Sequence, residues 1–168
     1  MSRSISDSRV VWLVVGLLGG LGIAIFWPHE PALASATDRT PQFAMATVSV
    51  NALTPLEGIF VLDFLTGTLR GAVLNEQTAK FSQFYLRNVA QDFQVDPKKE
   101  PRYAIVTGVA NINSRPGFQA ANGVVYVAEL SSGKVAAYGF PYVPARGPLP
   151  VVPMVPLDTL QFREPEEK

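Results

Sequence analysis

The sequence predicts a mainly β protein, in which an N-terminal transmembrane helix is followed by a small antiparallel β domain made of two three-stranded meander repeats with one short helix between them. Three observations lead to this fold class: an apolar run near the N-terminus, strand-length segments rich in β-branched residues, and a strand-turn-strand stretch that occurs twice. A chain of 168 residues can form one domain with appendages. We expect a signal-anchor segment over residues 1–34, a duplicated β-meander domain over 35–140 and a Pro-rich C-terminal arm over 141–168.

The N-terminal segment has the composition of a membrane anchor. Arg3 and Arg9 precede a run from Val10 to Phe26, which is 17 residues long and has no polar side chain. Because the run is apolar on every face, it predicts a transmembrane helix and not the amphipathic helix of a soluble domain. Arginines stay on the cytoplasmic side, so the rest of the chain is expected to be extracytoplasmic. We therefore expect a single-pass protein of the cytoplasmic membrane.

Two cleavage patterns leave the fate of this anchor open. Residues 32–34 read Ala-Leu-Ala and residues 34–36 read Ala-Ser-Ala, and both fit the small-x-small pattern of signal-peptide cleavage. The apolar run exceeds the usual core of a signal peptide and just reaches spanning length. We favour a retained anchor, and a cleaved leader with secretion to the periplasm is the alternative.

The region after the anchor contains two sets of predicted strands. The segments that have strand length and β-rich composition are 42–50, 58–64 and 68–75 in the first set, and 102–112, 123–130 and 133–140 in the second. Between the sets, the apolar residues Phe84, Val89 and Phe93 suggest a short helix. This helix should end before Asp96 and Pro97, because proline cannot continue a helix.

A turn with the same chemistry occurs in both sets. The stretch "FVLDFLTGTLRG", which begins at Phe60, aligns without a gap with "YVAELSSGKVAA", which begins at Tyr126. Glycine tolerates the positive φ of a tight hairpin, and a carboxylate can accept turn N–H groups that would otherwise be unpaired. We predict an internal repeat. Its structural turn residues are Asp63, Gly67, Glu129 and Gly133.

The repeated unit resembles a blade of a quinoprotein-type β-propeller, whose hallmark is an aromatic residue, an acid and a Thr-Gly turn between two strands. Two blades cannot close a propeller. The repeats therefore either pack face to face as a small sandwich or open barrel, or several chains complete a propeller-like ring. We favour a monomeric sandwich, since the exported residues are sufficient for one modest core.

At the level of the whole chain, the order of segments resembles a family of planctomycete membrane-anchored envelope proteins. The matching segments, between Ala36 and Tyr138, are "ATDRTPQFAMAT", "FVLDFLTGTLRGAVLN", "KFSQFYLRNVAQDF", "RYAIVTGVAN" and "VVYVAELSSGKVAAY". The sequence departs from the family at Val48, where that family usually has glycine. The resemblance implies a membrane-associated envelope protein and supplies no catalytic residues.

Composition excludes several functions. The 14 basic and 14 acidic residues are balanced, and apart from the terminal "REPEEK" there is no block of like charge, which argues against nucleic acid as a partner. Cysteine is absent and His29 is the one histidine, so a thiolate site, a Ser-His-Asp triad or a multi-histidine zinc site cannot be built. We assign no catalytic, cofactor-binding or metal-binding residue. The alternative is an envelope hydrolase or lyase that acts on polysaccharide through Asp63, Asp92 or Glu129.

The C-terminal arm contains seven of the 14 prolines. Proline lacks an N–H donor, so the arm should run over the surface as a polyproline-like segment, or else be recognised by an aromatic groove of a partner. Residues 157–162 could return as a last edge strand. Together these features predict a non-enzymatic protein with a structural or interaction role in the cell envelope. Its expected partners are membrane lipid, through the helix, and an envelope protein or another copy of the chain.

Overall fold

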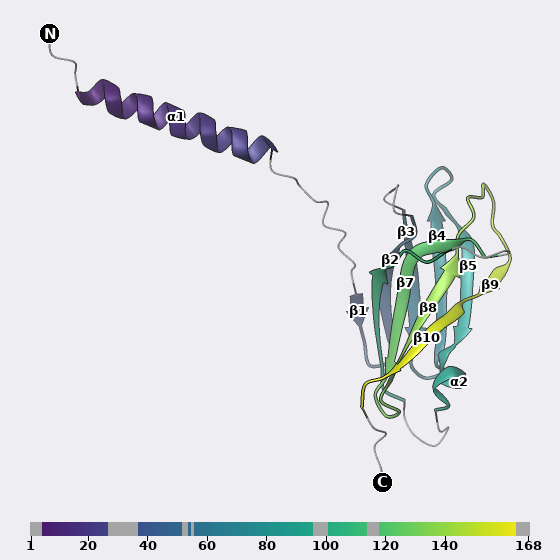
Figure 1. Ribbon diagram of the computed structural model, residues 1–168. Helices are drawn as coiled ribbons and strands as arrows, with labels where there is room; N and C mark the ends of the chain where they lie inside the picture. The colour runs from purple at the N-terminus through teal and green to yellow at the C-terminus, as the bar shows by residue number, and fades with distance from the viewer. Residues whose placement is uncertain are drawn as a thin grey trace. The chain divides into compact units, whose positions relative to one another are not determined.

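The computed structural model of the protein describes residues 5–26, 37–51, 54, 56–95, 101–113 and 118–163 (Figure 1). The chain divides into two compact units, Met1–Leu33 and Ala34–Lys168. The first unit contains helix α1 (Ile5–Phe26), and its described side chains, residues 10–20, are all exposed. The sequence predicts a transmembrane helix here. Among the described residues, no helix is both long enough and apolar enough to cross a membrane.

The second unit is mainly β and contains two sheets, which confirms the predicted fold class at this level. In spatial order, the first sheet consists of β1 (Thr37–Arg39), β2 (Phe43–Ser49), β3 (Glu57–Asp63), β4 (Thr68–Asn75), β5 (Lys80–Asn88) and β9 (Val151–Pro153). The second sheet consists of β10 (Val155–Gln161), β8 (Lys134–Pro141), β7 (Ala120–Glu129) and β6 (Tyr103–Val109). All strand pairs are antiparallel, apart from the parallel pair of β5 and β9.

The core lies between the two sheets. Buried and half-buried residues alternate along β2 and β3, as expected for strands that present one face to a core. Phe60 of the first sheet packs against Phe140 of the second, with 4.9 Å between the ring centroids, and Tyr85 lies 5.1 Å from the same Phe140 ring. The sheets are therefore layers of one sandwich, joined by aromatic contacts.

The segment between the two repeats differs from the prediction. The sequence suggests a helix that includes Phe84, whereas helix α2 covers Val89–Phe93 and Phe84 lies in strand β5, paired with Ala72. Phe84 lies in a strand because β5 pairs with β4. The local spacing of apolar residues does not reveal this pairing. The side chain of Asn88 caps α2 by accepting the backbone N–H of Gln91 at 3.3 Å. The expected stop at residues 96–97 lies outside the described residues.

The two repeats have matching strand registers, and each contains four strands. In both, the first strand begins opposite the acid of the turn, and the fourth strand ends opposite the residue that follows the turn glycine. The equivalent pairs are Phe43↔Asp63 with Tyr103↔Glu129, Asp63↔Thr68 with Glu129↔Lys134, and Thr68↔Asn88 with Lys134↔Gln161. Strand β10 is therefore the counterpart of β5, although the rest of the tail separates it from β8 in the sequence.

The described part of the tail forms strands over residues 151–161 where the sequence suggests a polyproline-like segment. Strand β9 pairs with β5 in the first sheet, and β10 pairs with β8 in the second. Between these strands Met154 is buried, and its backbone N–H donates to the carbonyl of Leu86 at 3.1 Å. Both strands occupy sheet edges, the position in which proline is tolerated. The tail thus connects the edges of the two sheets, and β10 lies close to the edge strand expected over residues 157–162.

Candidate functional site

The first predicted turn residue, Asp63, binds the turn that follows it. Its Oδ1 accepts the backbone N–H of Leu65 at 2.9 Å, and its Oδ2 accepts the hydroxyl of Thr66 at 2.9 Å. The hydrogen bond from the Thr66 hydroxyl is the main cause that lowers the pKa of Asp63. Burial opposes it, and the turn N–H groups lower the pKa further. Gly67 closes the turn with φ +61°, and a Cβ there would lie 2.5 Å from the Cβ of Ala90.

The second predicted turn residue, Glu129, performs the same task inside the protein. Its side chain is 1% exposed, and its two oxygens accept the backbone N–H groups of Ser131 at 3.0 Å, Ser132 at 2.6 Å and Arg102 at 3.3 Å. Burial opposes ionisation of Glu129, yet these donors outweigh it and lower its pKa. Gly133 closes this turn with φ +68°. The two turns therefore share hydrogen-bond chemistry and differ in burial.

The third candidate carboxylate, Asp92, lies on α2 and is held by partners from two other strands. Arg87 donates to Asp92 through Nε at 2.8 Å and Nη2 at 2.5 Å, and the hydroxyl of Tyr138 donates to Asp92 Oδ2 at 2.9 Å. Burial, followed by the hydrogen bond to Asp92, raises the pKa of Tyr138, so this hydroxyl keeps its proton and donates it. The bidentate pair with Arg87 attaches the short helix to β5, and the hydrogen bond from Tyr138 attaches it to β8.

Each of these three carboxylates is engaged by its own local hydrogen-bond partners. Asp63 and Glu129 bind the turns of two separate hairpins, and Asp92 is paired with Arg87 and Tyr138. None of them lines either of the two hollows described below. Carboxylate catalysis on a glycan requires two such groups at a fixed separation across a bound substrate. The arrangement therefore supports a role in folding for all three.

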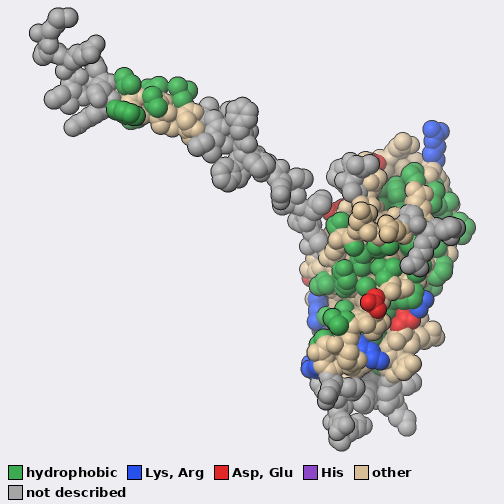
Figure 2. Space-filling model, in the orientation of Figure 1, with side chains coloured by type: hydrophobic (Ala, Val, Ile, Leu, Met, Phe, Trp, Pro, Cys, Tyr) green, Lys and Arg blue, Asp and Glu red, His purple; other side chains and the backbone are tan. Residues whose placement is uncertain are grey.

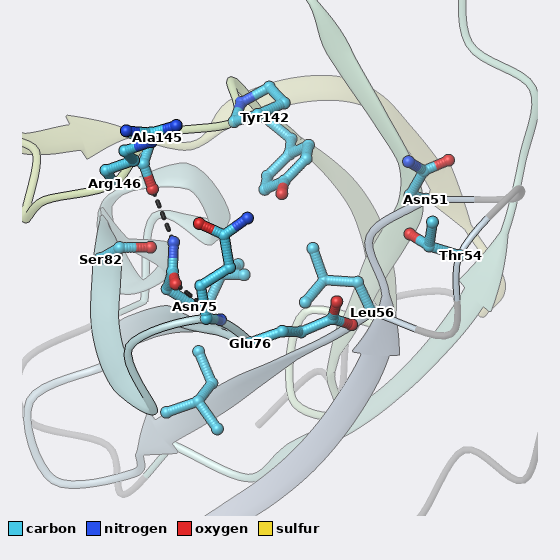
Figure 3. A pocket seen from close by; sticks show the side chains of 13 residues that line it. Asn51, Thr54, Leu56, Asn75, Glu76, Ser82, Tyr142, Ala145 and Arg146 are labelled. Carbon is cyan, nitrogen blue, oxygen red and sulfur yellow. Dashed lines mark hydrogen bonds between the residues drawn. The ribbon is translucent and has the colours of Figure 1, made fainter.

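The larger hollow, of about 400 Å³, lies between the β4–β5 turn and the start of the tail (Figure 3). The Nδ2 of Asn75 donates to the carbonyl of Ala145 at 2.7 Å and holds the two segments together. Burial, and then the negative charge of Glu76, raises the pKa of Tyr142, whose ring lies at this hollow. Arg146 adds a cation to the rim. Among the described residues, no three of the His, Asp or Glu side chains are placed to hold a metal ion.

The smaller hollow, of about 280 Å³, is apolar and lies on the outside of the first sheet. Its wall is formed by side chains of β3, β4, β5 and β9 that point away from the core, and Arg70 is the charged residue beside them. We call this surface face 1. Its apolar members are Phe43, Met45, Ile59, Val61, Ala72, Leu74, Phe84, Leu86 and Val151.

The outside of the second sheet is also apolar, and we call it face 2. Figure 2 shows hydrophobic side chains gathered over β7, β8 and β10 on this side. The outward positions of face 2 are Ala104, Val106, Gly108, Tyr126, Ala128, Val135, Ala137, Leu157 and Leu160. Val106 is 56% exposed and Leu160 is 65% exposed. Asp158, which pairs with Ala137, supplies a negative charge on this face.

The signal for these faces is present in the sequence. In "GIFVLDF" and "GVVYVAEL" nearly every position is apolar, whereas a strand with one solvent-facing side alternates between apolar and polar residues. Continuous apolar strands of this kind are typical of sheets that are covered on both faces. The sandwich covers one face of each sheet, and the other face of each carries exposed apolar residues.

Comparison with known proteins identifies no relative: no family model, no curated protein sequence and no solved structure matches this chain. The resemblance to planctomycete envelope proteins and to propeller blades therefore stays a prediction from the sequence.

Proposed function

We propose that this chain is a membrane-tethered β domain that acts in the cell envelope by binding another protein and not by catalysing a reaction. The observation that carries the proposal is the pair of apolar faces on the outer sides of the sandwich. Soluble domains rarely leave large apolar patches uncovered, and such patches mark interaction surfaces. The candidate carboxylates are engaged in local hydrogen bonds, which favours binding over chemistry.

The tether is the apolar segment at the N-terminus. The sequence from Val10 to Phe26 has no polar side chain, and its described apolar residues expose large side chains, with Trp12 exposed by 72%. Burial of such side chains in lipid is favourable, and Arg3 and Arg9 at the preceding end would remain in the cytoplasm. The β domain would then be outside the cytoplasmic membrane, or in the periplasm if the leader is removed.

Fractionation of cells that express the full chain with a C-terminal tag tests the tether. We expect the protein in the membrane pellet after alkaline carbonate extraction, with the tag digested when protease is added to spheroplasts. A variant that carries Leu13→Arg and Leu17→Arg should leave the pellet, since each arginine is costly at the centre of a span. Recovery of the unaltered protein in the soluble cytoplasmic fraction would rule the tether out.

A photo-crosslinking amino acid placed on face 2 tests the interaction role. The probe at Val106 should capture a protein partner in intact cells, whereas the same probe at the exposed turn residue Leu65 should not. Equal labelling at both positions would show that face 2 has no binding role.

A further inference from the structure

We infer that the partner of this domain is a second copy of the same chain, with face 1 of one copy stacked on face 2 of the next in a head-to-tail assembly. This inference rests on the proposed interaction function and specifies its partner. It follows from an unusual relation between the two repeats, which have the same register but bury opposite faces.

The reversal of the buried face is clear at aligned residues. Phe60 is fully buried, whereas its counterpart Tyr126 is half-buried and points outward on face 2. Glu129 is buried in the core, whereas its counterpart Asp63 is half-exposed at the end of face 1. Side chains on a strand alternate between two faces, so every inward position of one repeat corresponds to an outward position of the other.

The two repeats also run in the same direction where they meet. Thr107 Oγ1 donates to the carbonyl of Thr47 at 2.5 Å, and these two threonines occupy equivalent positions in β6 and β2. Toward the ends of these strands, the backbone N–H of Asn122 donates to the carbonyl of Val50 at 3.1 Å. Toward their beginnings, the ring of Tyr103 lies 6.1 Å from that of Phe64.

These contacts mean that the second sheet is stacked on the first without reversal of strand direction. Consecutive blades of a propeller are stacked in this way, with one side of each blade on the opposite side of its neighbour. We call this movement of one sheet onto the next, with strand direction kept, the stacking operation. Two sheets related by it leave one uncovered face at each end of the stack. Another copy placed by the same operation would cover that face, and the resulting contact is heterologous.

In a contact between two copies, face 2 would occupy the position that the inward surface of the first sheet occupies in the core. The two surfaces have similar composition. The inward residues of the first sheet and their outward counterparts on face 2 are Ala44 and Ala104, Ala46 and Val106, Phe60 and Tyr126, Leu62 and Ala128, Leu69 and Val135, and Gly71 and Ala137. All twelve are apolar or aromatic, and a small residue matches a small one at Ala44 and Ala104 and at Gly71 and Ala137.

Face 1 has the matching relation to the inward surface of the second sheet. Apolar inward residues with apolar counterparts on face 1 are Tyr103 and Phe43, Ile105 and Met45, Val125 and Ile59, Val127 and Val61, Tyr138 and Ala72, and Phe140 and Leu74. The exception is the buried Ala136, whose counterpart is the exposed Arg70. In the core, Phe60 contacts Phe140. Repetition of that contact places Tyr126 of one copy against Leu74 of the next.

The repeated stacking of the two sheets, and not charge, favours this pairing over the pairing of two identical faces. Face 1 carries charges of both signs, because Glu57 and Asp63 lie on it together with Arg70. Stacking of face 1 on face 2 places Arg70 and Asp158, both exposed, at the same interface. Because the stacking preserves strand direction, strand β1 of every copy would begin on the same side of the assembly.

The test measures the mass of the full chain in mild detergent by light scattering, for three variants. Val61→Asp places a charge on face 1, Val106→Asp places one on face 2, and Leu65→Asp is the matched control in a turn outside both faces. We expect the unaltered chain and the Leu65→Asp variant to assemble beyond a dimer, and each face variant to be monomeric by itself. An equimolar mixture of the two face variants retains one intact face 1 and one intact face 2, so it should form 1:1 dimers and nothing larger.

Several results would overturn the inference. They are a monomeric unaltered chain at high concentration, assembly of Val61→Asp by itself, or a mixture that stays monomeric. Circular dichroism shows whether the face variants are folded, and Leu86→Asp and Leu160→Asp replace any variant that is not. Capture of a different protein by monomeric chains would contradict this inference and leave the proposed interaction function intact. A chain that assembles but is found in the cytoplasm would contradict only the proposed membrane tether.

Discussion

Glu129 provides the sharpest test of the repeated turn, because the same turn chemistry occurs once in the core and once near the surface. In Glu129→Gln, one carboxylate oxygen that accepts a backbone N–H becomes an amide that can only donate. Glu129 is 1% exposed, so water cannot replace the lost acceptor. A hydrogen bond to a charged group contributes about 1.5–3 kcal/mol, and an unpaired buried donor costs about 1–3 kcal/mol. We therefore expect the free energy of unfolding to fall by about 3 kcal/mol.

The equivalent change in the first repeat should cost much less. Asp63 is half-exposed, so water can solvate the N–H groups of Leu65 and Thr66 that Asp63→Asn weakens. The expected loss is about 0.5–1 kcal/mol, as for replacement of a helix cap. Glu76→Gln, in an exposed turn, is the matched control and should change stability by less than about 0.5 kcal/mol.

Urea unfolding of the full chain, followed by far-ultraviolet circular dichroism, measures these differences as shifts of the midpoint at constant slope. If Glu129→Gln shifts the midpoint no more than Glu76→Gln does, the turn carboxylate has no structural role. If Asp63→Asn costs as much as Glu129→Gln, burial does not set the magnitude, and the reasoning above is wrong.

Three further predictions concern the same core. Gly67→Ala should destabilise the fold by about 2 kcal/mol in urea unfolding, because the positive φ is strained for alanine and the new Cβ meets Ala90; no loss would show that the turn relaxes freely. The hydroxyl of Tyr103 is buried without a hydrogen-bond partner among the described residues, so Tyr103→Phe should stabilise the fold by about 1 kcal/mol. Tyr138→Phe should destabilise it by about 1–2 kcal/mol, because it removes the hydrogen bond to Asp92. Thermal melts that rank the two variants the other way would contradict this assignment. The lowered pKa of Glu129 means that its contribution is fully present above its usual value of 4.5 and is lost as pH falls through the lower pKa of the folded state. The fall in stability below pH 4.5 should therefore be shallower in Glu129→Gln, and equal slopes would exclude this source.

The turns and most of the strands could be predicted because their signals are local. Gly67 and Gly133 adopt the positive φ that glycine after an acid suggests, and strand-length apolar runs form β3 and β7. Local signals failed at Phe84, whose place in a strand depends on pairing with Ala72. They failed again in the tail, where proline content favours an extended arm and pairing to β5 and β8 decides the outcome.

The relation between the repeats was beyond sequence reasoning for a different physical reason. The alignment of Phe60 with Tyr126 suggests that both point the same way relative to the core, yet they point in opposite senses. Strands that are apolar on both sides do not specify which face is buried, because either choice removes apolar surface from water. The choice is made by the stacking of the two sheets, and it creates faces 1 and 2.

Cross-linking tests the stacking of face 1 on face 2 most directly. The sequence has no native cysteine, so the reagent can react only with the cysteines that are introduced. A full chain that carries both Leu74→Cys and Tyr126→Cys, treated in membranes with a short bismaleimide, should give a ladder of dimers, trimers and larger species. Each single cysteine variant should stay monomeric under the same treatment. The absence of a ladder, or dimers formed by the Tyr126→Cys variant by itself, would contradict the head-to-tail account.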